Sequence, residues 1–233
     1  MYRQIFVFGQ GRSGTNAVGL WVHCQCPREY RFTPKRGSRL YFQEKSTRPF
    51  VANSPMISLK EFAKLSKRNG GHLNKDYRRI LFVLRDPFNF FASQMRHYRV
   101  KVRSGAKEPP RKELFHRLTR GWKTFAREAI GLTHILPEGS IYVSYNHWFA
   151  DRAYRKQIIE DLDLDFTDAG INLVSKHGGG SSFDRRKYNK KAQQMNVLDR
   201  WKAFQDDRFY RGLFDQEILE MSQDLFGDPP FVI

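Results

Sequence analysis

Residues 5–16 read IFVFGQGRSGTN and carry the strongest local pattern in the sequence. Four apolar residues, typical of a strand buried on both faces, run into Gly9, and further glycines follow at positions 11 and 14. An apolar helical pattern begins directly afterwards. Glycine lets a backbone approach a ligand closely, and the N-terminus of a helix attracts anions. The stretch therefore predicts a strand, a phosphate-binding loop and a helix in succession.

Strand and helix patterns alternate along the rest of the chain. Strands are predicted at residues 4–9, 39–42, 49–53, 78–85 and 141–145. Helices are predicted at residues 14–24, 58–68, 88–103, 111–130 and 148–162, and the C-terminal third is predicted to be helical apart from a loop at 177–182. This alternation predicts a single α/β domain, residues 1–233, with a mostly parallel sheet that binds ligands at the carboxyl ends of its strands.

The charge balance indicates an anionic partner. The 41 lysines and arginines exceed the 24 aspartates and glutamates, which gives a formal net charge of +17. The basic residues concentrate at 99–127 and 185–202. Such an excess favours nucleotides, acidic glycans, nucleic acids or membrane surfaces as partners.

Cysteine content and hydropathy bear on the compartment. No apolar run approaches the roughly 18 residues of a membrane span, and no signal-peptide pattern precedes the first strand. Cys24 and Cys26 are too few and too close together for a disulfide framework. We therefore expect reduced thiols at a helix end and a cytoplasmic protein.

The glycine loop fits three templates. Gly9, Gly11 and Gly14 have the spacing of a dinucleotide-binding fingerprint, which also needs a second strand that ends in an acidic residue about 20 positions on. The corresponding stretch, residues 28–36, is basic and has a poor strand pattern. Gly9 and Gly14 also have the spacing of a Walker A loop, but Thr15 stands where the phosphate-binding lysine belongs. These observations argue against a nicotinamide-dependent oxidoreductase and against a standard ATPase or kinase.

The third template is the 5′-phosphosulfate loop of the sulfotransferases, which use 3′-phosphoadenosine 5′-phosphosulfate (PAPS). Arg12-Ser13-Gly14-Thr15 resembles the form of this loop in protein-tyrosine and related sulfotransferases. The resemblance implies that the loop and the following helix N-terminus cradle the 5′-phosphate. It also implies that Arg12 neutralises the bridging oxygen as the S–O bond breaks. The cofactor-binding residues that it assigns in this segment are Gly11, Arg12, Ser13, Gly14, Thr15 and Asn16.

A second motif stands in residues 81–94, LFVLRDPFNFFASQ. The family binds the 3′-phosphate of the nucleotide with an arginine at a strand end and a serine eight residues later, and Arg85 and Ser93 have this spacing. Asp86 and Pro87 are the expected N-cap and first residue of the intervening helix. Ser93 then lies about two turns along it, so that a guanidinium and a hydroxyl converge on one phosphate.

Two further segments resemble the family more loosely. Tyr145 follows the strand IYVS and matches a tyrosine that lies near the nucleotide base, although Asn146 and His147 replace the acidic residues that come next. In residues 178–191, GGGSSFDRRKYNKK, Phe183 corresponds to a phenylalanine that packs on adenine. The resemblance places Ser181 or Ser182 beside the base, and the basic residues from Arg185 onward supply positive charge.

The sequence also departs from the family. Asn16-Ala17 replaces a Thr-Trp pair of the cytosolic members, which removes one aromatic wall of the adenine site. The Arg-Lys-Gly element that clamps the 3′-phosphate in those members has no counterpart, since Gln194-Met195-Asn196 stand ahead of Trp201. The basic residues at 185–191 are the expected substitute.

Together, these motifs resemble a divergent, small PAPS-dependent sulfotransferase, which has a P-loop-type, mostly parallel sheet flanked by helices on both faces. The resemblance implies an enzyme that uses PAPS as co-substrate, without a metal, to sulfate a hydroxyl or amine. The expected acceptor is polar or anionic, such as an acidic saccharide. A phenolic acceptor is the alternative that the aromatic residues allow. The alternatives are an atypical P-loop kinase and a non-enzymatic nucleic-acid-binding protein, which the charge alone favours.

The sequence leaves the general base open. Glu29 and Glu44 follow the loop helix, where some branches of the family have a glutamate, and His23 is a third candidate. Glu29 is the preferred catalytic residue. His97 is interpreted as a helix-surface residue, and its position one turn beyond Ser93 leaves open whether it faces the pocket.

Overall fold

The structure, a computed structural model, describes residues 4–34, 49–54, 58–61, 64, 78–176 and 180–231. The strand predicted at 39–42 lies outside these residues, as do Glu44 and most of the helix predicted at 58–68. Residues 59–61 and 64 of that helix are described, and they are helical.

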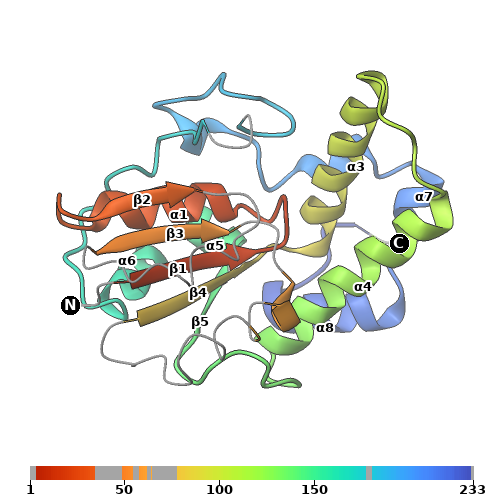
Figure 1. The fold of residues 1–233 in the computed structure, drawn as a ribbon. Helices are drawn as coiled ribbons and strands as arrows, with labels where there is room; N and C mark the ends of the chain where they lie inside the picture. The colour runs from red at the N-terminus through yellow and green to blue at the C-terminus, as the bar shows by residue number, and fades with distance from the viewer. Residues whose placement is uncertain are drawn as a thin grey trace.

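Five parallel strands form the central sheet of the described residues (Figure 1). Their spatial order is β2 (Arg31–Pro34), β3 (Phe50–Ser54), β1 (Gln4–Gly9), β4 (Arg78–Leu84) and β5 (Ile141–Ser144). The chain leaves β1 toward β2 and β3 on one side, whereas β4 pairs with β1 on the other. Such a reversal of strand order opens a crevice at the carboxyl ends of the two central strands, where ligands of open α/β sheets bind.

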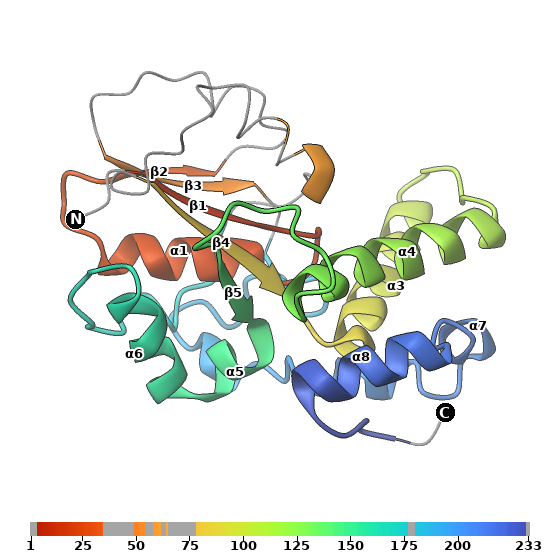
Figure 2. The same cartoon turned by 90° about the horizontal axis from the view of Figure 1, so that it is seen from below.

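Each face of the sheet has its own apolar core, because successive side chains of a strand point to opposite faces. Phe6, Phe8 and Phe82 belong to one core, whereas Val7 and Val83 belong to the other. The first core includes residues of α3 (Pro87–Arg103), α4 (Arg111–Ala129), α7 (Arg208–Arg211) and α8 (Gln216–Phe226). The second core includes residues of α1 (Thr15–Gln25), α5 (Tyr145–Ala150) and α6 (Arg152–Glu160) (Figure 2). The predicted P-loop-type α/β fold with helices on both faces is confirmed.

The prediction that residues 28–36 make a poor strand is wrong for β2. Residues 31–34 pair in parallel with β3, and Phe32 packs against the second core. Among the described strands β2 has only this one neighbour. An edge strand tolerates charged side chains and a terminal proline such as Pro34, since its outer backbone groups need no partner in the sheet. This tolerance explains the weak pattern.

The start of α3 is built as predicted and holds a distant segment in place. Asp86 caps the helix by accepting a hydrogen bond from the backbone N–H of Asn89 at 2.8 Å, and Pro87 is the first helical residue. The Asn89 amide donates to the carbonyl of Leu198 at 2.8 Å and accepts from the backbone N–H of Arg200, also at 2.8 Å. The segment that begins η3 (Arg200–Ala203) is therefore fixed against the carboxyl end of β4.

Two helical predictions need revision. The helix predicted at 148–162 is two helices, because Ser144 caps α5 and Asp151 caps α6. The C-terminal third contains η2 (Ala192–Gln194), η3, α7 and α8, but turns and an isolated bridge between Ser181 and Arg185 precede them. These turns bring residues 173–175 and 180–181 over the start of α1.

Candidate functional site

The loop between β1 and α1 is tightly folded on itself. The hydroxyl of Ser13 is buried, donates to the carbonyl of Gln10 at 2.7 Å, and lies 3.2 Å from the hydroxyl of Thr15. Arg12 and Gly14 have positive φ angles of 80° and 94°, which curl the backbone toward the helix. The first N–H groups of a helix have no helical partner and attract anions. The loop therefore has the backbone of a phosphate-binding turn.

The aromatic ring of Tyr145 lies directly against this loop. A Cβ atom at Gly14 would come within 2.1 Å of the ring. Tyr145 is the first residue of α5, and its ring also lies 5.0 Å from the guanidinium carbon of Arg85. Tyr145 thus joins the loop to the end of β4.

Replacing Gly14 with alanine is expected to lower the free energy of unfolding by about 2 to 5 kcal/mol, because a positive φ and a ring contact both oppose a side chain. Gly105 is the matched control, since its φ is +90° and no atom lies within 4 Å of the position of its Cβ. Alanine there should cost only about 1 to 2 kcal/mol. Chemical unfolding of both variants measures the difference, and equal losses would contradict the close contact with Tyr145.

Arg85 leaves β4 and turns its side chain inward. It is 2% exposed, and its guanidinium donates through Nη2 to the carbonyl of Val197. Its carbonyl accepts a hydrogen bond from the indole of Trp122 at 2.9 Å. Burial lowers the pKa of Arg85, and among the described residues it makes no ion pair. A buried guanidinium with an unpaired Nε is suited to bind an anion.

Arg200 was not predicted as a site residue, and it lies next to the same space. Its side chain is buried; Nη2 donates to the hydroxyl of Ser181 at 2.8 Å and lies 3.4 Å from the Asp184 carboxylate. Its guanidinium carbon is 5.0 Å from the centre of the Phe183 ring. The sequence signal was slight: one arginine before a tryptophan within a basic segment.

The charges of these arginines act on one another. Burial first, and then the charges of Arg85 and Arg185, lower the pKa of Arg12 to about 10. Burial and then Arg85 lower the pKa of Arg200 to about 10 as well. The Nε atoms of Arg12, Arg85 and Arg200 are all buried without a hydrogen-bond partner in the described structure. A bound anion would relieve both the crowding of positive charge and the unpaired donors.

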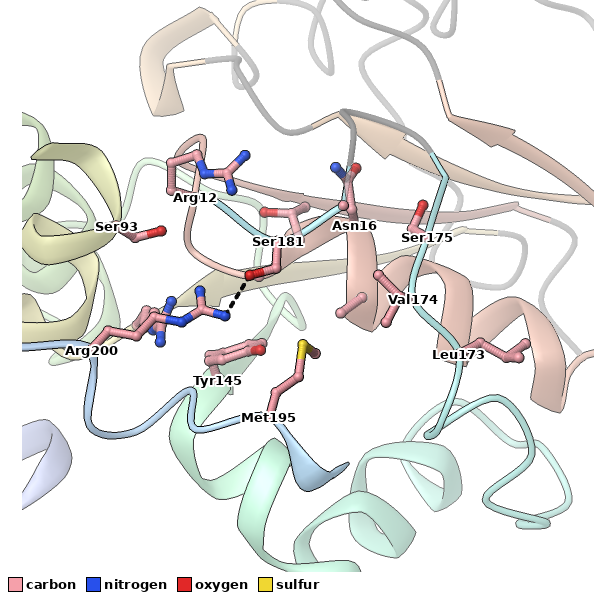
Figure 3. A pocket seen from close by; sticks show the side chains of 15 residues that line it. Arg12, Asn16, Ser93, Tyr145, Leu173, Val174, Ser175, Ser181, Met195 and Arg200 are labelled. Carbon is pink, nitrogen blue, oxygen red and sulfur yellow. Dashed lines mark hydrogen bonds between the residues drawn. The ribbon is translucent and has the colours of Figure 1, made fainter. Parts of the chain in front are cut away.

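These side chains meet in one cavity of about 100 Å³, shown in Figure 3. Seven predicted residues line it: Arg12, Gly14, Thr15, Asn16, Arg85, Ser93 and Tyr145. Ser181, which was predicted as an alternative to Ser182, also lines the cavity. The remaining seven lining residues were not predicted: Ala17, Leu173, Val174, Ser175, Gly180, Met195 and Arg200. No carboxylate is among these lining residues.

Five of the predicted cofactor-binding residues lie outside this lining. Gly11 faces a second cavity, and Ser13 is buried within the loop. Ser182 lies behind Ser93, with 2.7 Å between the hydroxyl oxygens. Phe183 packs against the first core, beside Phe204 and under Arg200, and so does not reach the cavity as an adenine wall would. Arg185 is exposed and contributes only its charge to Arg12.

The structure does not bring Glu29 to the cavity. Glu29 is exposed in the turn after α1, at the opposite end of that helix from Gly14. An 11-residue helix is about 16 Å long, which is too far for a carboxylate to act at the loop. His23 is also remote and donates through Nε2 to the carbonyl of Tyr30 at 3.1 Å. The preferred base is therefore wrong, and Glu44 lies outside the described residues.

A second cavity of about 450 Å³ lies between α3 and α4 and meets the first at the loop. Arg12 and Asn16 line both cavities. Asn16 is held from below by Asn53 of β3, whose amide donates to it at 2.6 Å. The two cavities therefore share a wall that carries one guanidinium.

Two further searches of the described part of the chain concern metal sites and membrane-spanning helices. It contains no cluster of three His, Cys, Asp or Glu side chains with the arrangement of a metal site. None of its helices combines the length and the apolar character that a transmembrane segment requires.

Comparison with known proteins identifies the fold. The sequence matches no family model and no curated protein. The sulfotransferase domain from the curacin biosynthetic pathway is similar in structure, with a TM-score of 0.62 at 10% identity over 99% of both chains. Mouse sulfotransferase SULT7A1 complexed with PAP has a TM-score of 0.61 at 12% identity over 95% of this chain and 84% of that one. The protein has the sulfotransferase fold.

Proposed function

We propose that the protein is a sulfotransferase that transfers a sulfuryl group from PAPS to a hydroxyl of an acceptor. The observation that carries this proposal is the convergence of three arginines, Arg12, Arg85 and Arg200, on one cavity beside a glycine loop, each with a buried Nε that has no hydrogen-bond partner in the described structure. A cavity whose described lining has three guanidiniums and no carboxylate suits a ligand with several negative charges. PAPS carries such charges on both sides of its ribose, and the fold supports the same reading.

The arginines divide naturally between the two ends of this nucleotide. Arg85 precedes α3 and Ser93 lies about two turns along it, and we assign both to the 3′-phosphate together with Arg200. Arg200 then takes the place of the Arg-Lys-Gly element that the sequence lacks. Arg12, Thr15 and the first turn of α1 take the 5′-phosphosulfate.

The adenine is assigned to the apolar part of the lining. Leu173, Val174 and Met195 line the cavity opposite Arg200, and Leu173 is 37% exposed, which is unusual for a large apolar side chain of this protein. A purine packed there would cover it. These side chains replace Phe183 in the expected role.

The role of Arg12 follows from the chemistry of the transfer. Sulfuryl transfer resembles phosphoryl transfer, in which positioning and charge stabilisation supply most of the catalysis. Negative charge grows on the leaving oxygen as the S–O bond breaks. Arg12 lines both cavities, so its guanidinium is placed to offset that charge between donor and acceptor.

The size of the first cavity bears on how a nucleotide would bind. Its volume of about 100 Å³ is below the roughly 300 to 1,000 Å³ of small-molecule sites. It accommodates an anionic group, and we propose that the segments at 173–175 and 180–181, which line it together with the start of α1, move to admit a whole nucleotide. We therefore expect binding to change the protease sensitivity of these segments.

The proposal predicts selective stabilisation by adenosine 3′,5′-bisphosphate (PAP), the product left by PAPS. At 100 times its dissociation constant, PAP should stabilise the fold by about 2.7 kcal/mol, whereas ATP with Mg²⁺ should have a much smaller effect. Thermal unfolding with each ligand measures this. The reverse order would favour an atypical kinase, and salt-sensitive oligonucleotide binding without an effect of PAP would favour a nucleic-acid-binding protein.

A further inference from the structure

The second cavity, which we call the α3–α4 cavity, is built from regular faces of two helices. Phe90, Gln94, His97 and Lys101 line it from α3, at spacings that place them on one side of the helix. Arg117, Leu118, Gly121 and Phe125 line it from α4 in the same way. Most of the lining therefore comes from the helix pair, and Gln10, Gly11 and Arg12 of the glycine loop close one end.

Direct contacts fix this helix pair to the glycine loop. The amide of Gln94 donates to the carbonyl of Gly11 at 2.7 Å. A Cβ atom at Gly121 would come within 2.4 Å of the Gln10 amide nitrogen, so that α4 makes room for this loop side chain by having a glycine. The mouth of the cavity thus has a defined position relative to Arg12.

The charge of the lining has one sign. Arg12, Lys101 and Arg117 contribute positive charge, and no aspartate or glutamate is among the described residues that line the cavity. The guanidinium of Arg117 is held 4.8 Å from the centre of the Tyr98 ring. Aromatic side chains from both helices supply flat apolar walls beside these cations. This combination suits a ring compound that carries an anionic group.

His97 is the side chain of the lining best suited to accept a proton near neutral pH. Gln94 is the residue of α3 that contacts the glycine loop. His97 lies one turn further along α3, about 4.5 Å from Gln94 along the helix axis. Among the described residues, Lys101 of α3, Arg117 of α4 and Arg12 of the loop are the charged side chains that line the same cavity. His97 therefore lines the same cavity as these cations and as Arg12 and Asn16, which form the wall shared with the first cavity.

We propose that the α3–α4 cavity binds the acceptor, that this acceptor is a hydroxyl compound bearing a carboxylate, and that His97 is the general base. The inference rests on the proposed function. In the transfer step the acceptor oxygen forms a bond to sulfur, and its proton passes to the imidazole of His97. The bond between sulfur and the bridging oxygen of PAPS breaks, and PAP leaves with the electron pair.

The charge requirement is tested with phenyl glucuronide and phenyl glucoside, which differ by a carboxylate. With PAP-saturated protein, calorimetry should give at least tenfold tighter binding of the glucuronide. The double variant Lys101→Gln/Arg117→Gln should lose this preference. Lys112→Gln/Arg120→Gln removes the same charge from exposed positions of α4 outside the lining and should keep it. Equal binding of both compounds, binding of neither, or an unchanged preference in the first double variant overturns the acceptor assignment.

The base is tested with His97→Gln and the control His116→Gln, an exposed histidine of α4 outside the lining. His97→Gln should slow PAP formation from PAPS with phenyl glucuronide by about 100-fold or more and leave the affinity for PAP unchanged. It should also abolish the fall in rate at low pH, because that fall reflects protonation of the base. A wild-type rate or an unchanged profile overturns the role of His97. Failure of the wild-type protein to bind PAP would instead overturn the proposed function itself.

Discussion

Replacement of Arg85 by methionine is expected to weaken the binding of PAP by about 100-fold or more, and that of 5′-AMP by much less. The two ligands differ by the 3′-phosphate, which we assign to Arg85 and Ser93. Removing one partner of a buried, hydrogen-bonded charge pair costs about 2 to 5 kcal/mol, and about 2.7 kcal/mol is a factor of 100. The side chain of Arg85 is buried and lies among other arginines, so water cannot replace it.

Arg155 provides the matched control, because it is also 2% exposed but belongs to α6. Two of its nitrogens donate to the Asp168 carboxylate at 2.8 Å each, outside the cavity. Arg155→Met should destabilise the apo protein by about 3 to 5 kcal/mol, since it leaves a carboxylate without its partner, and should leave the preference for PAP over 5′-AMP intact. Calorimetric titration of both ligands into both variants measures the contrast. If Arg85→Met weakened both ligands equally, the 3′-phosphate assignment would be wrong.

The parts of the site that the sequence could predict are those set by local geometry. Gly9 to Thr15 form one turn between a strand and a helix, and the spacing of Arg85 and Ser93 is that of two helical turns. Such local patterns depend on residues that are close in sequence, so they can be recognised without knowledge of the tertiary contacts. The central strands β1 and β4 were predictable because buried strands have continuous apolar runs, whereas the edge strand β2 lacks such a run and was missed.

The remaining parts depend on contacts between distant segments. Arg200 enters the site because the amide of Asn89, 111 residues earlier, accepts a hydrogen bond from its backbone. No pattern around Arg200 encodes this contact. Phe183 was assigned to adenine from its neighbours in sequence, but the turn at 181–185 directs it into the core instead.

Glu29 failed for a related reason. Its position in the sequence, soon after the glycine loop, suggested proximity, whereas an intervening straight helix separates the two. His97 is the opposite case: it is distant from the loop in sequence, yet Gln94 holds its helix against Gly11. A candidate base is therefore better chosen from the helix faces that line the cavity than from the residues that follow the loop.

Replacement of Arg12 by asparagine is expected to lower the rate of PAP formation from PAPS by about 100- to 1,000-fold, which is the usual effect of removing one donor that stabilises a transition-state charge. Asparagine suits the test, because it tolerates the left-handed backbone of residue 12, whose φ is 80°. Arg185→Gln is the control, since this exposed arginine contributes charge to Arg12 without lining either cavity. Its rate should fall only slightly.

Comparing the effect of Arg12→Asn on kcat with its effect on the affinity for PAP shows whether Arg12 stabilises the transition state or only binds the nucleotide. An interaction made mainly in the transition state lowers kcat with little change in ligand binding, whereas uniform binding raises KM and leaves kcat unchanged. Because Arg12 lines the wall between the two cavities, we expect its loss to affect kcat far more than the affinity for PAP. If Arg12→Asn lowered the affinity for PAP and kcat/KM by the same factor with kcat intact, Arg12 would serve only to hold the nucleotide. The charge at the leaving oxygen would then have to come from the backbone of the loop and the N-terminus of α1.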